Sequence, residues 1–178
     1  REVFESSWFA GGATVIERLN WRHWAGAAPL FLMPGAEVVR CAPLRMFWSQ
    51  LVEDRLLPAL LTETKRVSNG EPPSTVVLRA RAGSAVLGLA TWQKDPVWPQ
   101  TAMLDVFCHP AHWDRACELL AALPLPAGLR LVAFADVTAH AKISALKAAG
   151  FVQTAILPKR IAMERSATER IDVVQMEK

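Results

Sequence analysis

We single out six side chains in the second half of the chain as candidates to transfer protons, attack as nucleophiles or bind metals. They are Asp105, Cys108, His109, His112, Asp136 and His140. Carboxylates and imidazoles exchange protons near neutral pH, and a thiolate is a nucleophile. Cys108, His109 and His112 are close in sequence, but Pro110 separates the histidines and a fourth ligand is lacking. We therefore predict no metal site.

Four of these residues also have a structural interpretation. Asp105 is either a general base or a solvent-side strand residue, and Cys108 either a nucleophile or a small apolar core residue. Asp136 is placed to cap a helix that begins near Thr138. His140, in the first turn of that helix, is either catalytic or simply exposed. The sequence alone leaves these alternatives open.

A β-α-β-α unit over Thr101–Phe151 carries all six residues. The apolar patterns predict strands over 101–108 and 129–135, each followed by a helix, over 110–123 and 138–149. Gly150-Phe151 closes the second helix. Two strands joined through a helix should pair in parallel, and the first strand–helix turn is where free N–H groups would hold an anion.

The remaining elements predict an α+β fold with a mixed sheet. Before the unit we expect a strand over 37–44, a helix over 45–67 that Pro58 kinks or splits, and an antiparallel hairpin of 75–82 with 85–93. After it we expect a strand over 153–161 interrupted by Pro158, a polar loop over 164–169 and a last strand over 171–176.

Residues 1–35 are harder to interpret. Proline and glycine near their end predict a linker, so we divide the chain into a segment 1–35 from a longer protein with an upstream domain, and a domain 36–178. Arg1 in place of methionine points the same way. Trp8, Trp21 and Trp24 should cover apolar surface on this domain or on a neighbour.

Composition narrows the classes of function. Hydrophobic residues make up 52% of the 178 residues, enough for a large core, and no apolar run is long enough to cross a membrane. The net charge is only +3 and the basic residues are scattered, which argues against nucleic acid as a partner. The three cysteines show no CxxC spacing, so no disulfide framework is expected. We predict a cytoplasmic protein.

In its element order and in several short motifs, the chain resembles the Gcn5-related N-acetyltransferase family. The motifs are Gly88 in the second hairpin strand, the stretch Leu104–Pro110, the Leu119-Leu120 helix ending and Ala145–Phe151. The resemblance covers roughly residues 37–177. It implies a mixed central sheet flanked by helices, in which the fourth strand of the family's domain splays from the fifth. An acyl-CoA, acetyl-CoA or a longer one, enters between them as co-substrate, and the acceptor is an amine on a small molecule or a peptide.

The resemblance also implies roles for particular residues. The backbone of Val106, Phe107 and Cys108 would bind the pantetheine chain. The pyrophosphate would lie on the next turn, where Ala116 fits the last position of the family's pattern. His112 and Arg115 occupy arbitrary positions of that pattern and could add phosphate affinity. The acid or base would be Asp105, His109 or His140.

Two departures from the family pattern keep a second function open. Asp114 replaces a glycine of the phosphate turn, which adds a Cβ and a negative charge near a dianion, although an acidic residue also suits a helix N-terminus. Leu146 stands where many members have a tyrosine acid, and the chain has no tyrosine. The sequence is therefore compatible with an active N-acyltransferase or with an inactive binding or regulatory module of the same fold.

Overall fold

The structure is a computed structural model that describes residues 9, 12–33, 37–47, 52–163 and 166–178. The strands are β1 (Thr14–Arg18), β2 (Val39–Cys41), β3 (Met46–Phe47), β4 (Thr75–Ala80), β5 (Val86–Lys94), β6 (Thr101–Cys108), β7 (Arg130–Asp136), β8 (Val152–Met163) and β9 (Ser166–Glu177). The α-helices are α2 (Trp24–Leu32), α3 (Val52–Ser68), α4 (Ala116–Ala122) and α5 (His140–Ala148), and the short 3-10 helices are η1 (Trp21–His23) and η2 (Pro110–Arg115).

Seven strands form one sheet in the order β1-β4-β5-β6-β7-β9-β8. All neighbours are antiparallel except β6 and β7, which confirms the predicted hairpin and the predicted parallel pair. The parallel pairing covers only Thr101–Met103 of β6 against Arg130–Val132 of β7. Beyond that point the two strands separate, so the sheet is open along the second half of β6.

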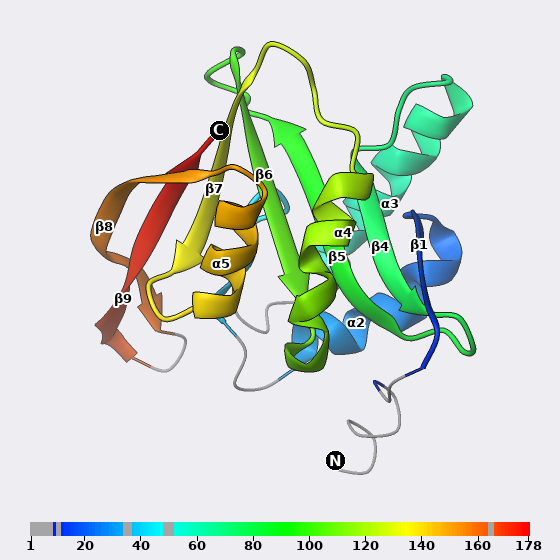
Figure 1. Ribbon diagram of the computed structural model, residues 1–178, viewed down its shortest axis with the longest axis horizontal. Helices are drawn as coiled ribbons and strands as arrows, with labels where there is room; N and C mark the ends of the chain where they lie inside the picture. Colours follow the sequence, from blue (N-terminus) through cyan, green and yellow to red (C-terminus); the bar gives the residue numbers. More distant parts are fainter. Residues whose placement is uncertain (1–8, 10–11, 34–36, 48–51, 164–165) are drawn as a thin grey trace.

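Helices cover both faces of the sheet (Figure 1). A Cβ placed on Gly88 would meet Cys108 and Leu119, so α4 packs on the face to which Cys108 points. Phe107, the next residue along β6, stacks on Phe31 of α2 at 5.6 Å between ring centroids. Because successive strand residues point to opposite faces, α4 and α2 lie on opposite sides; α5 accompanies α4, and α3 accompanies α2.

Residues 14–33 belong to this domain. β1 pairs with β4 from Thr14 to Arg18, and Leu30 and Phe31 of α2 are fully buried in the main core. The boundary predicted at residue 35 therefore falls inside the folded unit, and Pro29 lies within α2 and not in a linker. The origin of the chain in a longer protein and an upstream domain stay predictions.

Residues 37–67 differ from their predicted pattern. The strand is limited to Val39–Cys41 and pairs with the short β3, which the sequence pattern assigns to a helix. The helix begins at Val52, and it runs through Pro58 without splitting. Residues 48–51 of the predicted helix lie outside the described residues.

The β6–α5 unit matches its prediction most closely. β6 spans the predicted residues, while the first helix is divided into η2 and α4. Gly150 ends α5 with a φ of +91°, and Phe151 N–H donates to Leu146 O, a common helix ending. The chain then forms the long β8–β9 hairpin, in which β9 already begins at Ser166, so the predicted polar loop is wrong over 166–169. Residues 164 and 165 of that predicted loop lie outside the described residues.

Candidate functional site

Where β6 and β7 separate, backbone groups of β6 have no partner on β7. His109 N–H donates to Leu87 O on β5, so the backbone of His109, and of Phe107 two residues before it, faces β5. The backbone groups of Val106 and Cys108 alternate with these and face β7. Of the three predicted pantetheine partners, Val106 and Cys108 therefore border the opening, and Phe107 does not.

A buried ion pair fills the narrow end of this opening. Lys142 Nζ lies 2.6 Å from Asp105 Oδ1 and donates to Val39 O at 2.8 Å, and both side chains are fully buried. Lys142 comes from α5 on one face of the sheet, whereas β2 lies against the other face. The lysine side chain therefore passes between β6 and β7.

Asp105 is saturated with hydrogen bonds. Its Oδ2 accepts from Ala42 N–H at 2.8 Å and its Oδ1 from Val106 N–H at 2.7 Å, in addition to the Lys142 ion pair. Burial raises the pKa of this carboxyl to about 6, although Lys142 and the two amides oppose the shift. The solvent-side alternative for Asp105 is thus wrong.

Asp136, at the end of β7, binds the backbone at the start of β2. Its carboxylate accepts from the N–H groups of Val38 and Val39, and it is buried. α5 begins with Ala139 at its N-cap and no side-chain capping bond, so the predicted capping role of Asp136 is wrong. The carboxylates of β6 and β7, together with Lys142, hold β2 across the opening.

The turn before α4 contains the two basic residues predicted to bind pyrophosphate, Arg115 and His112, and both side chains already have protein partners. The Arg115 guanidinium makes two hydrogen bonds of 2.7 Å to Glu118 and one of 2.8 Å to Thr14 Oγ1. His112 is buried, with Nε2 3.4 Å from Phe9 O. Asp114 is exposed on η2. The expected phosphate turn is therefore built with its basic groups already engaged.

The remaining predicted residues are placed as follows. His109 accepts the Ala111 N–H on Nδ1 and stacks on Phe9 at 4.3 Å between centroids. His140 is exposed at the start of α5, and Ala116 is fully buried at the start of α4. Burial raises the pKa of Cys108 to about 12, which favours the apolar-core alternative for this thiol over the nucleophile.

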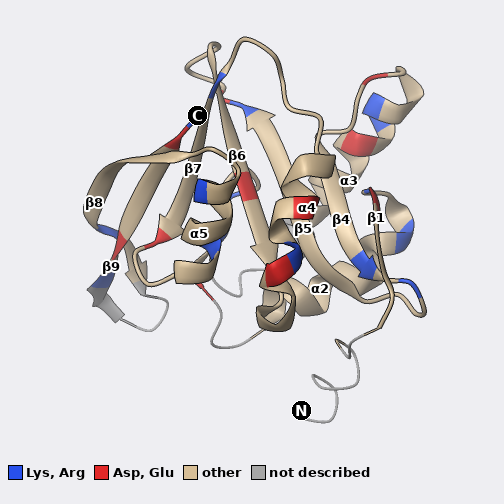
Figure 2. Ribbon diagram, in the orientation of Figure 1, with Lys and Arg blue, Asp and Glu red and all other residues tan. Residues whose placement is uncertain are grey.

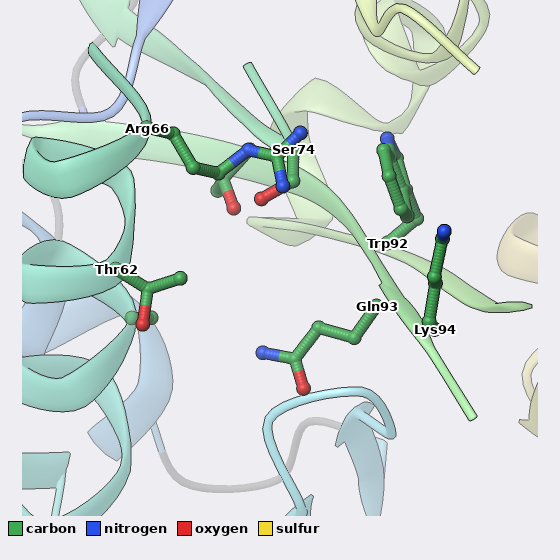
Figure 3. Close-up of a pocket in the computed structure, with 8 residues that line it drawn as sticks. Thr62, Arg66, Ser74, Trp92, Gln93 and Lys94 are labelled. Atoms are coloured by element: carbon green, nitrogen blue, oxygen red, sulfur yellow. The ribbon is translucent and has the colours of Figure 1, made fainter. Parts of the chain in front are cut away.

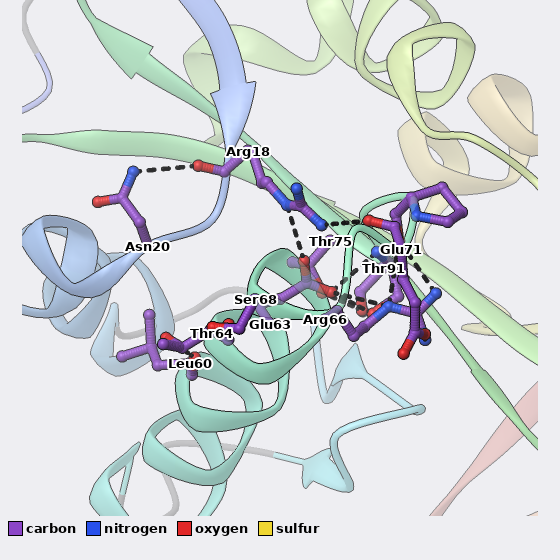
Figure 4. A network of polar contacts seen from close by, with 12 residues as sticks. Arg18, Asn20, Leu60, Glu63, Thr64, Arg66, Ser68, Glu71, Thr75 and Thr91 are labelled. Atoms are coloured by element: carbon purple, nitrogen blue, oxygen red, sulfur yellow. Dashed lines mark hydrogen bonds and ion pairs between the residues drawn. The ribbon is translucent and has the colours of Figure 1, made fainter.

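A hollow of about 360 Å³ lies between α3 and β5, lined by Thr62, Arg66, Ser74, Trp92 and Lys94 among others (Figure 3). Its polar groups are largely engaged in structure. Glu63, buried beside it, accepts from Ser74 and pairs with Arg18 at 3.5 Å (Figure 4). The Arg66 guanidinium lies 5.3 Å from the Trp92 ring centroid. None of the predicted site residues lines this hollow.

Comparison with known proteins rests on structure. No protein-family model matches the chain, and no curated protein matches it. Among solved structures it is similar to yncA from Salmonella typhimurium with acetyl-CoA, with 21% identity, 94% coverage of both chains and a TM-score of 0.65. It is also similar to an acetyltransferase of the GNAT family from Streptococcus pneumoniae, with 16% identity, 93% and 99% coverage and a TM-score of 0.63. The chain has the fold of the Gcn5-related N-acetyltransferases.

A third similar structure with this fold is the phosphinothricin acetyltransferase from Sinorhizobium meliloti in complex with acetyl-CoA, with 12% identity, 94% and 88% coverage and a TM-score of 0.63.

Within the described ranges, no helix is long and apolar enough to span a membrane. No group of three or more His, Cys, Asp and Glu side chains among those same residues is arranged to hold a metal ion.

Lys142 is the residue of this site that sequence reasoning missed. It precedes Ala145 by three residues and Leu146 by four, and those two form the buried face of α5. Helical spacing therefore placed a lysine on the core-facing side. A lysine on such a face requires a buried partner, and Asp105 was the available carboxylate.

Proposed function

We propose that the chain is an acyl-CoA-dependent N-acyltransferase that moves an acyl group from a thioester to an amine. The observation that carries the proposal is the opening between β6 and β7, which begins after Met103 and leaves the backbone groups of Val106 and Cys108 without a β7 partner. An extended pantetheine chain offers amide groups that can pair with such a strand edge. Structures with this fold have been solved with acetyl-CoA.

In this proposal the fold contributes mainly by positioning. The amine attacks the thioester carbonyl, the C–N bond forms, and the CoA thiolate leaves; the amine proton passes to a base. Asp105 is the predicted base that borders the opening, and with a pKa of about 6 it is ionised at neutral pH. It reaches an amine only if β2 or Lys142 moves, because its carboxylate is fully buried. His109 and His140 are the alternative bases.

A second function, that of an inactive module with the same fold, is favoured by specific contacts. Lys142 fills the narrow end of the opening, and Arg115 is committed to Glu118. The exposed Asp114 adds a negative charge where a pyrophosphate would lie. Such a module would bind a partner or ligand without transferring an acyl group.

Calorimetric titration with acetyl-CoA separates the two functions. The proposed enzyme binds one molecule per chain with a dissociation constant below about 1 mM. Asp114→Gly should tighten binding by about threefold to tenfold, since like charge near a dianion is unfavourable even when partly screened. Asp114→Asn is the matched control: it removes the charge and keeps the side chain, so it separates charge from close approach. Absence of heat at about millimolar acetyl-CoA would favour the inactive module.

A further inference from the structure

A cavity of about 770 Å³ opens on the β2 side of the sheet, on the face opposite α4 and α5. It lies where β6 and β7 stop pairing, since Met103 and Phe134 are part of its lining. Most of its wall is apolar, formed by Val39, Met103, Phe134, Leu157, Ile161 and Val173. A volume of this size accommodates a small organic molecule.

Two arginines supply the charge of this cavity. Arg45 and Arg160 line it, both are exposed, and neither guanidinium has a hydrogen bond or an ion pair within the described part of the chain. No Asp or Glu is among the described residues that line the cavity. An apolar pocket with two available guanidiniums is complementary to a ligand with an apolar body and an anionic group.

The backbone beside both arginines is strained. Arg45 and Lys159 are the non-glycine residues with positive φ among those described, at +55° and +49°. Arg45 N–H donates to Ala42 O, which closes its turn, and Lys159 N–H donates to Asp172 Oδ1 at 2.8 Å. Non-glycine residues in this region cost free energy and occur preferentially at ligand sites. One strained residue is thus the cavity arginine Arg45 itself, and the other, Lys159, directly precedes the cavity arginine Arg160.

From these observations we infer that the cavity binds an amphipathic anion, a molecule with an apolar body and a carboxylate or phosphate. The cavity lies beside the point where β6 and β7 stop pairing, on the face of the sheet opposite α4 and α5. The identity of the ligand as acyl acceptor rests on the proposed function. If that function holds, the amine acceptor itself is such an anion. A polyamine is the wrong charge for this pocket.

Binding of matched probes to the full chain tests the inference. The probes are 4-phenylbutanoate, 2-phenylethyl phosphate and 4-phenylbutylamine, which share a phenylalkyl body and differ in charge. We expect at least one anionic probe to bind about tenfold more tightly than the amine in calorimetry. The carboxylate and phosphate arms show which anion the pocket prefers.

Two variants assign that preference to the arginines. Arg45→Asn retains a residue that tolerates positive φ, and Arg160→Gln retains a polar side chain; each should weaken the anionic probe about threefold to tenfold. Arg81→Gln, at an exposed arginine in the β4–β5 connection, is the matched control and should change nothing. Equal affinity for all three probes, or an unchanged affinity in both pocket variants, would overturn the inference.

The outcome is separable from that of the proposed function. Anion binding with no acetyl-CoA binding would leave the pocket assignment intact and remove the transferase. Acetyl-CoA binding with no preference for the anionic probes would do the reverse.

Discussion

The Asp105–Lys142 pair sets the energetics of the opening between β6 and β7. Both groups are fully buried, and the carboxylate also accepts two backbone N–H groups. A buried pair of this kind adds little net stability compared with apolar residues, but loss of one partner leaves an uncompensated charge and costs about 3–5 kcal/mol. The pair therefore resists any movement of α5 relative to β6 that separates the two side chains.

The raised pKa of Asp105 predicts a pH dependence of stability. An unfolded aspartate has a pKa of about 3.9, and the folded value is about 6. The folded state then holds more protons than the unfolded state between these values, so the free energy of unfolding should fall as pH rises through this window, by about 3 kcal/mol. Urea unfolding between about pH 4 and pH 7 measures this decrease, which Asp105→Asn should remove.

Glu17→Gln provides the control of opposite sign. Hydrogen bonding to Arg79 lowers the pKa of Glu17 to about 2, so its contribution is present above the ordinary value and is lost at lower pH. Its replacement should leave the slope between pH 4.5 and pH 6 largely unchanged. Our account of the Asp105 carboxyl would be contradicted if the free energy of unfolding of the wild type, relative to that of Asp105→Asn, rose with pH between the unfolded and folded pKa values of Asp105.

At the residue scale, the sequence identified several of the groups at the opening but not their contacts. Asp105, Val106 and Cys108 were predicted from a family resemblance. Their burial and the passage of Lys142 between the strands depend on residues about 40 to 100 positions apart, such as Val39 and Lys142. Spacing within α5 indicates that Lys142 faces the core, but it does not specify which residues of other elements Lys142 contacts.

At the scale of elements, β1 and α2 dock against the hairpin β4–β5. α2 approaches this hairpin so closely that a Cβ on Gly26 would lie 1.7 Å from Ser84 O. Glycine at this position is what permits the contact. The docking brings Leu30 and Phe31 into the core.

Gly26→Ala should therefore destabilise the protein by about 3 kcal/mol or more, because backbone on the hairpin has to move. Gly12→Ala, which has no neighbour within 4 Å of its added Cβ, should have an effect within about 0.5 kcal/mol. Chemical denaturation of the two variants checks the difference. Equal stabilities would mean that α2 is not packed on this hairpin as described.

The elements predicted best are those with strong local patterns. β6 was predicted to the residue and α5 to within two residues at its start, because alternation, helical spacing and Gly150 mark them. β1 and the first half of β9 were missed since their strand character comes from pairing with β4 and with β8, respectively. The apolar residues of 13–24 recur at mixed spacings, so their pattern predicts neither a strand nor its partner.

At the scale of the whole molecule, basic and acidic residues are interspersed over the elements (Figure 2). The ion pairs are spread in the same way: Glu17 with Arg79, Arg115 with Glu118 and Arg130 with Glu177 belong to different parts of the sheet and its helices. The distinctive feature of the molecule is instead the opening between β6 and β7. The Asp105–Lys142 ion pair lies in this opening, and the cavity lies beside it on the β2 side of the sheet.

The most direct test of the account is to map where acetyl-CoA contacts the protein, by following backbone amide chemical shifts during a titration. We expect the largest changes at Val106 and Cys108 and on the facing residues of β7, since pantetheine should pair with the part of β6 that has no β7 partner after Met103. Changes confined to other surfaces, such as the hollow between α3 and β5, or no change at saturating acetyl-CoA, would contradict the proposal that the opening between β6 and β7 is an acyl-CoA site.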